Sequence, residues 1–310
     1  MPAEISAVDY MASGNNIVPW HKLGTVVDGL RTSEEVLAKA RLNWEVKKMP
    51  IQVVGGKTIA RQFATVREDT GDVLGVVGQI YTPIQNTDGL DILDPVIGKD
   101  AAYETAGSLR GGKIVWFLAS MKKDYFLGSK NDKMKQYFLV YLSHDGSKPV
   151  SVRFVNTRVV CMNTLSAATR ETPALVTLRH TVNYASKLEQ VQHIVGLADK
   201  HAQEFEKIFV TLSSKKMSET AARDFTKEIF PGDKKQSRDM QEQLFTLFKS
   251  GIGNEGKTRA DAMNAVSEYV SSHKRVRAKT AEAVASARFE NAMFGYGLTL
   301  EQKALELLLN

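Results

Sequence analysis

QYFLVYLSHDGSKPVSVRFVNTRVV, residues 136–160, holds two runs of β-branched and aromatic residues on either side of the polar segment HDGSKP. Such runs favour strands, and Asp145-Gly146 is a common turn pair. The segment KIVWFLASM, residues 113–121, comes before them and has the same composition. Successive strands joined by tight turns pair antiparallel, so the sequence predicts an antiparallel sheet in this part of the chain.

The residues before this region predict a further hairpin and short helices. TIARQFATVRED at 58–69 and VLGVVGQIYTPI at 73–84 indicate two strands around the turn at 70–72. Thr32-Ser33-Glu34-Glu35 has the form of a capping box, which starts a helix. NTDGLDILDPVIG at 86–98 predicts another short helix.

After about residue 180 the apolar residues recur at helical spacing, as in NYASKLEQVQHIVGLADKHAQEFEKIFVTL at 183–212. Four or five further helical segments follow before the end of the chain, and Pro231-Gly232 ends the first of them. The predicted fold is therefore α+β: an N-terminal antiparallel β-sheet with short helices, followed by a mainly helical C-terminal part. We divide the chain into a sheet domain, 1–180, and a helical region packed on or beside it, 181–310.

Composition indicates a cytoplasmic protein with a polyanionic partner. The chain has 310 residues, a formal net charge of +6 and a single cysteine, Cys161, which cannot form an internal disulfide. The N-terminus lacks the basic start and apolar run of a secretory signal, and no stretch has the apolar length of a membrane helix. We expect Cys161 to be a buried structural thiol, and Trp20 and His21 to hold the N-terminal segment in place.

GIGNEGKT, residues 251–258, matches the pattern of a phosphate-binding loop. Such a loop needs a buried strand before it, whereas the preceding MQEQLFTLFKS has the apolar period of a helix. Only about fifty residues follow, too few for the strands and magnesium-binding carboxylate of an ATPase. We therefore expect no ATP hydrolysis and no cofactor, although a glycine-rich turn with a lysine also suits a nucleic-acid phosphate.

Two other patterns are interpreted as turns. GSLRGGKI at 107–114 lacks the hydroxyl residue of a nucleotide loop and precedes a strand, so a hairpin turn is expected. Ser143, His144 and Asp145 are consecutive, so their side chains point in different directions and do not form a catalytic triad. The histidines show no metal-ligand spacing except His193 and His201, which are eight residues apart on one predicted helix and have no third ligand nearby. We predict neither a metal site nor catalytic residues.

Basic residues give the clearest functional signal. SSHKRVRAKT at 271–280 contains four cations and no acid, and further cations occur in the two glycine-rich segments and in the strand-like runs. Tyr137, Phe138 and Tyr141 are either core residues or stacking platforms for unpaired bases. The predicted phosphate contacts are Arg110, Lys113, Arg153, Arg158, Lys257, Arg259, Lys274, Arg275 and Arg277.

Several long segments resemble one family along nearly the whole chain. They are VPWHKLGT (18–25), YTPIQN (81–86), ETAGSLRGGKIVWFLA (104–119), SHDGS (143–147), RVVCMNTL (158–165), RHTVN (179–183) and GNEGKTRADAMNAVSEYV (253–270). Together they resemble the phage/plasmid-like protein family catalogued as domain of unknown function 932. That resemblance implies a phage, prophage or plasmid origin but no activity, and it implies that 253–258 precedes a helix outside any ATPase domain.

A sheet with a basic face followed by helices is also similar, at the level of fold alone, to the single-strand annealing proteins of the Red beta, RecT and Erf type. The function expected first is therefore a phage-type single-stranded DNA-binding protein that promotes strand annealing or recombination without ATP, as a homo-oligomeric ring or filament. One alternative is an enzyme acting on nucleic acid or nucleotides through Ser143, His144, Asp145 or Glu104. Another is a structural or host-interaction protein of the phage.

Overall fold

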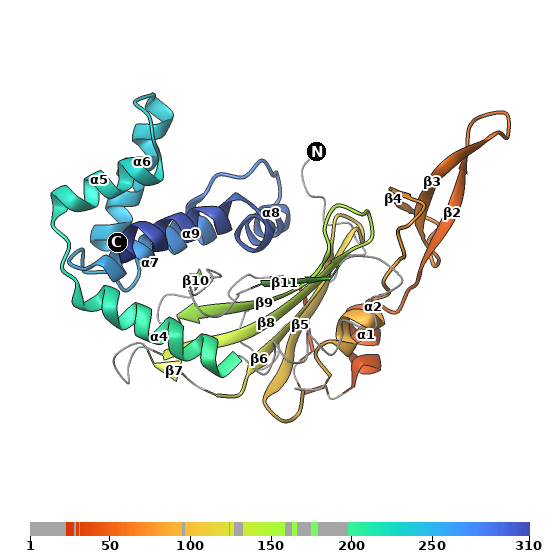
Figure 1. Cartoon of the computed structure of the whole chain (residues 1–310), viewed down its shortest axis with the longest axis horizontal. Helices are drawn as coiled ribbons and strands as arrows, with labels where there is room; N and C mark the ends of the chain where they lie inside the picture. Colours follow the sequence, from red (N-terminus) through yellow and green to blue (C-terminus); the bar gives the residue numbers. More distant parts are fainter. Residues whose placement is uncertain are drawn as a thin grey trace.

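The structure is a computed structural model, and it describes residues 23–27, 29–30, 32–94, 97–123, 125–126, 133–158, 163–165, 175–178 and 198–310. Cys161, Trp20, His21 and the proposed boundary at residue 180 lie outside these ranges. The fold is α+β as expected, with antiparallel sheets and short helices first and a helical region after them (Figure 1).

The main sheet has eight described strands in the order β1-β5-β6-β8-β9-β10, with β7 paired to β8 and β11 paired to β9. All pairings between its described strands are antiparallel. The strands are β1 (Thr25–Val26), β5 (Ala101–Leu109), β6 (Ile114–Met121), β7 (Tyr125–Phe126), β8 (Lys133–Ser143), β9 (Val150–Arg158), β10 (Asn163–Leu165) and β11 (Leu175–Leu178). The three strands expected at 113–160 form its centre as β6, β8 and β9.

Both faces of this sheet are buried. On β6, Ile114, Trp116 and Leu118 belong to one hydrophobic cluster, while Val115 and Phe117 belong to another on the opposite face. The second cluster includes the short helices α1 (Ser33–Ala40) and α2 (Asn86–Asp91). Figure 1 shows α1 and α2 on one side of the sheet and the C-terminal helices on the other, so the sheet is a layer between helices.

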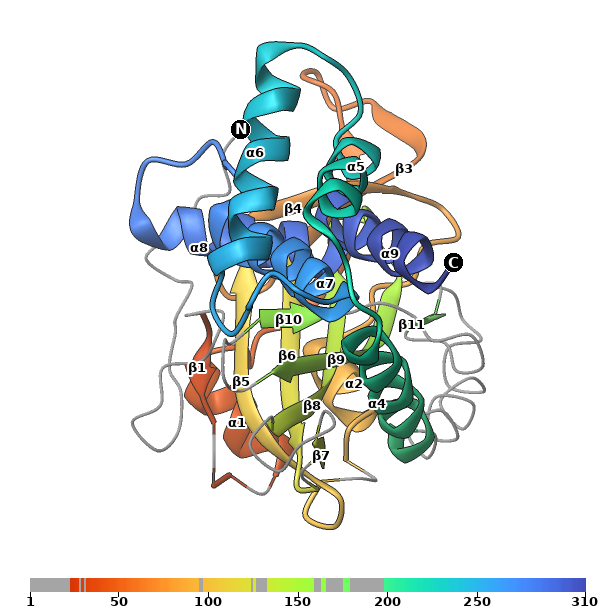
Figure 2. The ribbon, with the colours of Figure 1, turned by 90° about the vertical axis from the view of Figure 1, so that its left-hand side faces the viewer.

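The C-terminal helices cover the first face and share its hydrophobic cluster. In Figure 2 most of them lie across one end of the sheet, and the first runs beside the strands. They are α4 (Ala198–Ser214), α5 (Glu219–Ile229), α6 (Lys235–Ser250), α7 (Arg259–Glu268), α8 (Ala281–Phe294) and α9 (Tyr296–Leu309), with a π-helical turn, η2 (Tyr269–His273), directly after α7. Among the described helices, none combines the length and apolar character that a membrane crossing requires.

The local signals in the first half predicted the right kinds of element, although the second strand of the hairpin ends at Gly78 and α2 ends at Asp91, before the predicted bounds at 84 and 98. Thr32 caps α1 in a capping box with Glu35. The predicted hairpin forms as β3 (Thr58–Arg67) and β4 (Val73–Gly78), with Gly71 in the left-handed conformation that its turn requires (φ 75°). The sequence did not indicate β2 (Val46–Gln52), which pairs with β3 and completes a separate three-stranded sheet.

Candidate nucleic-acid interface

The segment with the nucleotide-loop pattern, 251–258, joins α6 to α7, so a helix precedes it, as expected from its sequence. The Asp261 carboxylate occupies its backbone donors. Oδ2 of Asp261 accepts hydrogen bonds from the N–H groups of Lys257 and Thr258, both at 2.9 Å, and from the Thr258 hydroxyl at 3.0 Å. Thr258 in turn caps α7 by accepting from the Asp261 N–H at 3.2 Å. The donors that would hold a phosphate are therefore bonded to a carboxylate of the same chain.

The cations of this loop are also engaged. Lys257 forms an ion pair with Glu255 at 2.8 Å, and the Arg259 guanidinium donates to the Leu308 carbonyl. Both cations lie at the start of α7, whereas Lys274 follows η2 at the other end. The ten residues of α7 and five of η2 separate the two ends by roughly 20 Å. The predicted basic residues from 257 to 277 therefore form two separate groups.

The second glycine-rich segment is the turn between β5 and β6, as expected. Arg110 has a left-handed backbone (φ 56°) and forms an ion pair with Glu290 of α8. Lys113 is half-buried, and its carbonyl accepts the His144 N–H at 2.8 Å. Arg110 therefore links the sheet to α8, and its charge is neutralised by Glu290.

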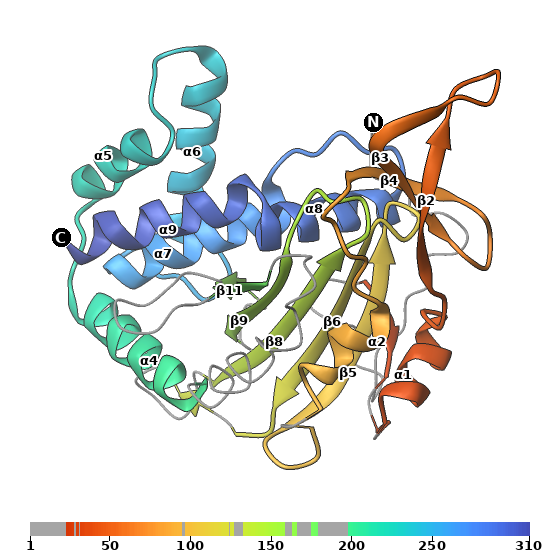
Figure 3. The ribbon, with the colours of Figure 1, turned by 45° about the vertical axis from the view of Figure 1, so that its right-hand side comes forward.

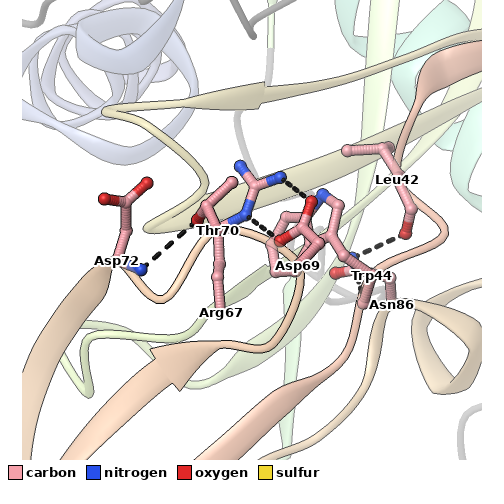
Figure 4. A network of polar contacts seen from close by, with 7 residues as sticks. All are labelled: Leu42, Trp44, Arg67, Asp69, Thr70, Asp72 and Asn86. Carbon is pink, nitrogen blue, oxygen red and sulfur yellow. Dashed lines mark hydrogen bonds and ion pairs between the residues drawn. The ribbon is translucent and has the colours of Figure 1, made fainter.

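This turn packs against Trp44 and Arg67, which belong to a network of polar contacts that extends to the exposed Asp69 (Figure 4). Gly112 has a left-handed backbone (φ 92°), which favours glycine, and a Cβ atom there would lie 3.2 Å from the Trp44 ring, a tight contact. The Arg67 guanidinium lies over Trp44, 4.3 Å from the ring centroid, and donates two hydrogen bonds to Asp69, at 3.0 and 2.7 Å. Arg67 lowers the pKa of Asp69 through these bonds. The network stabilises the junction between the two sheets.

Ser143, His144 and Asp145 serve the turn between β8 and β9. The Ser143 hydroxyl accepts the Lys148 N–H at 2.9 Å and donates to the Lys148 carbonyl at 2.8 Å. His144 is buried, with Nε2 2.9 Å from Oδ1 of Asn86. Asp145 accepts the N–H two residues further on, at 2.9 Å. These three side chains therefore hold the turn and its packing, and Glu104, the fourth residue of the enzyme alternative, lies on β5.

Arg153 does not lie on a surface. Its side chain is 3% exposed, between the sheet and α9, where it interacts with Tyr141 and is attracted by Glu301. Burial lowers its pKa, and those two partners oppose the shift. Arg158 ends β9, and its side chain is outside the described part of the chain. The expected row of strand arginines on an exposed face therefore does not include Arg153.

The aromatic residues of β8 belong to the core. Tyr137, Phe138 and Tyr141 are all buried, and Phe138 packs on Phe154 with 5.2 Å between ring centroids. They offer no face to an unpaired base. Of the two interpretations made from the sequence, core residues and stacking platforms, the structure shows the first.

The remaining predicted cations lie in the segment between η2 and α8, which we call the cationic loop (residues 274–280). Exposure alternates along it: Arg275, Arg277 and Lys279 are exposed, while the residues between them are half-buried. The alternation places the three cations on the outer side, roughly 7 Å apart along the backbone. Within the part of the chain that the structure describes, none of the three has a hydrogen bond or ion pair. Residues 269–281 contain no acid to neutralise them.

Lys274 begins the cationic loop beside an exposed aromatic ring. Its Nζ lies 4.5 Å from the centroid of Tyr296 and donates to Oδ1 of Asn291. Partial burial lowers the pKa of Lys274. The Tyr296 side chain is 56% exposed at the first position of α9. An exposed ring at the start of a loop that carries three unpaired cations is an arrangement with which proteins bind single-stranded nucleic acids, through base stacking and phosphate contact.

Two residues near this loop were missed from the sequence. Tyr296, the aromatic member of the site, is 22 positions from Lys274. Arg288 is three residues before Asn291 on the same face of α8, and within the described part of the chain its buried Nε has no hydrogen-bond partner. No local pattern joins these residues to the loop. Their proximity follows from the packing of α8 and α9 against η2.

No group of three or more His, Cys, Asp or Glu side chains within the described ranges is placed to hold a metal ion. In a comparison with family models, residues 73–292 match the model described as "Domain of unknown function (DUF932)". No curated protein and no solved structure matches the chain.

Proposed function

This chain belongs to the DUF932 family, a domain of unknown function, and we propose that it is a single-stranded DNA-binding protein that promotes strand annealing without ATP. The observation that carries the proposal is the cationic loop, with Arg275, Arg277 and Lys279 exposed on one side and Tyr296 next to Lys274. Successive cations at this spacing suit successive phosphates of an extended strand.

A single strand suits this site better than a duplex. The face of Tyr296 can stack only on a base that is not already stacked and paired. Contacts to phosphates and to one base face leave the hydrogen-bonding edges of the other bases free for a complementary strand. Annealing in this form needs no covalent chemistry, which agrees with the use of the 251–258 donors by Asp261.

Two further expectations belong to this proposal. A subunit with one short cationic loop contacts few nucleotides, so we expect several subunits to assemble along a strand as a ring or filament. The phage, prophage or plasmid origin implied by the sequence resemblance is compatible with a role in DNA recombination. The fold-level likeness to annealing proteins supports the same role more weakly.

The test is fluorescence anisotropy of a labelled single-stranded oligonucleotide, titrated with protein at several salt concentrations. Charge reversal of Arg275, Arg277 and Lys279 to Glu should remove most of the binding. Removal of three contacts should reduce the salt slope by about two units, at about 0.7 per phosphate. The matched control reverses three exposed lysines outside the site, Lys207→Glu, Lys216→Glu and Lys235→Glu, and should bind like the parent.

Tyr296 is tested separately. Tyr296→Ala should weaken binding by about 1–3 kcal/mol, whereas Tyr296→Phe keeps the ring and should bind normally. Binding by the parent should be followed by nucleotide-free annealing of complementary strands in a quenching assay, with assembly measured by mass photometry. Absence of single-strand binding at low salt would refute the function, and unchanged binding by the triple variant would refute the site.

A further inference from the structure

The hairpin of β2 and β3 projects from the body of the molecule (Figures 1 and 3). We call residues 47–64 the β arm. Every residue from 52 to 62 is exposed, and Val54 at the tip is fully so. Both views place the β arm and the segment before α8 on the same side of the molecule. An extended hairpin with both faces in solvent has little to stabilise it in isolation, which suggests a binding role.

The charge of the β arm has one sign. Residues 46–67 contain no Asp or Glu. Lys47 and Lys48 are held at the base, Lys47 by Glu68 and Lys48 by the carbonyls of Gln79 and Tyr81. Lys57 and Arg61 lie further out, and both are exposed. Neither has an ion-pair partner in the described part of the chain, so the outer half of the arm presents two unneutralised cations.

Arg61 lies in a distortion of the hairpin. Pro50 pairs with Phe63 and Gln52 pairs with Thr58, so four residues of β3 oppose one residue of β2 between these pairs. Within this bulge Arg61 adopts a left-handed backbone (φ 60°), which is unfavourable for a residue with a Cβ. Bulges redirect side chains, and backbone strain at an exposed residue indicates a functional constraint.

We propose that the β arm inserts into a groove of double-stranded nucleic acid, with Lys57 and Arg61 on the phosphates and the Val53–Val54 tip against base edges. A two-stranded ribbon fits the major groove, which is about 12 Å wide, and aliphatic groups contact the thymine methyl there. The polyanion neutralises both cations. This site is separate from the cationic loop and does not depend on single-strand binding.

The composition of the arm favours a duplex over the other possible occupants. Two arms of like charge repel each other, which disfavours an arm-to-arm dimer. The tip carries no Trp, Tyr, Phe or Leu, the residues that anchor a segment in a membrane interface. Unpaired backbone groups along the outer edge of β2 would be costly in lipid, whereas a hydrated groove satisfies them.

The experiment measures anisotropy with a blunt labelled duplex and, in parallel, with one of its strands alone. Lys57→Glu with Arg61→Glu should weaken duplex binding at least tenfold and reduce its salt slope by about two units. The same variant should bind the single strand nearly normally. Arg275→Glu with Arg277→Glu should show the opposite selectivity, and Lys207→Glu with Lys216→Glu is the matched control.

Arg61→Gly separates binding from structure. Glycine tolerates the left-handed conformation, so the melting temperature should stay the same or rise, while duplex binding should still fall several-fold. A purely structural Arg61 would leave duplex binding unchanged, which would overturn the proposal.

Three other results would overturn it as well. They are no duplex binding by the parent at low salt, arm-dependent binding to phosphatidylserine vesicles in place of duplex, and arm-dependent self-association without any effect on duplex. Loss of single-strand binding alone would leave the arm proposal standing and refute the proposed function.

Discussion

At the scale of single residues, Asp261 explains why a nucleotide-loop pattern occurs in a loop that follows a helix and not a strand. Its carboxylate accepts from three backbone N–H groups and one hydroxyl of the loop, and its own N–H completes the cap of α7. Glycine in the loop also allows the backbone to adopt this conformation. Gly256 has a left-handed backbone (φ 68°), and a Cβ there would lie 3.0 Å from Lys249 Cα. The spacing of the pattern thus reflects a helix cap.

Asp261→Ala should lower the free energy of unfolding by about 1–3 kcal/mol, because it leaves the loop donors without an acceptor and removes part of the cap. Urea unfolding measures this loss. Asp239→Ala, at an exposed position of α6, is the control and should change little. Addition of Mg-ATP should not shift the melting temperature of the parent, and a saturable shift would contradict the assignment of the loop to Asp261.

At the scale of elements, β4 shows how a strand is fitted to its neighbours. Leu74 and Val77 are buried, while Val73 and Val76 on the same strand are exposed. Gly75 lies against the β8–β9 turn, where a Cβ would be 2.6 Å from the Cα of Asp145. The three-stranded sheet that carries the β arm therefore packs closely on the β8–β9 turn, in part because Gly75 has no side chain at this contact.

Gly75→Ala should destabilise the protein by about 1–3 kcal/mol, because the new methyl group overlaps a backbone that cannot move aside cheaply. Gly78→Ala on the same strand has no atom within 4 Å of the new Cβ and should be nearly neutral. Urea unfolding measures both. Limited proteolysis should cleave the arm faster in Gly75→Ala than in Gly78→Ala, and equal rates would show that this contact does not hold the sheet in place.

At the scale of the whole molecule, the main sheet is a layer between two sets of helices, and this arrangement decides which charges reach solvent. Arg153 and the cations of the cationic loop looked equivalent in the sequence. Arg153 lies beneath α9, near Glu301, whereas Arg275 and Arg277 lie outside the helical layer. A buried guanidinium of this kind contributes to the contact between layers.

Arg153→Ala should cost on the order of 3 kcal/mol in unfolding free energy, because Glu301 would stay buried without the nearby cation. The affinity of the folded fraction for single-stranded DNA should not change. Urea unfolding and anisotropy on the same samples test both statements, with Arg238→Ala on the exposed face of α6 as control. A loss of DNA affinity with no change in the free energy of unfolding would show that Arg153 contributes to DNA binding.

The sequence by itself determined the elements whose signals are local. The hairpin at 58–78, the capping box at Thr32, the strands around 144–149 and the C-terminal helices all depend on neighbouring residues, and all were found. The strand β2 was missed, because Lys47, Lys48 and Pro50 give it the composition of an exposed edge.

Only the tertiary structure decided which cations are exposed and unpaired, and which residues lie beside them. Both faces of β6, β8 and β9 are buried, so alternation along these strands cannot tell which face meets helices or that Arg153 is covered. Tyr296 joins Lys274 through the packing of α9 against η2, a contact between distant positions. Local propensity depends on neighbours in the chain, whereas exposure and charge neutralisation depend on neighbours in space, and the candidate site is built from the latter.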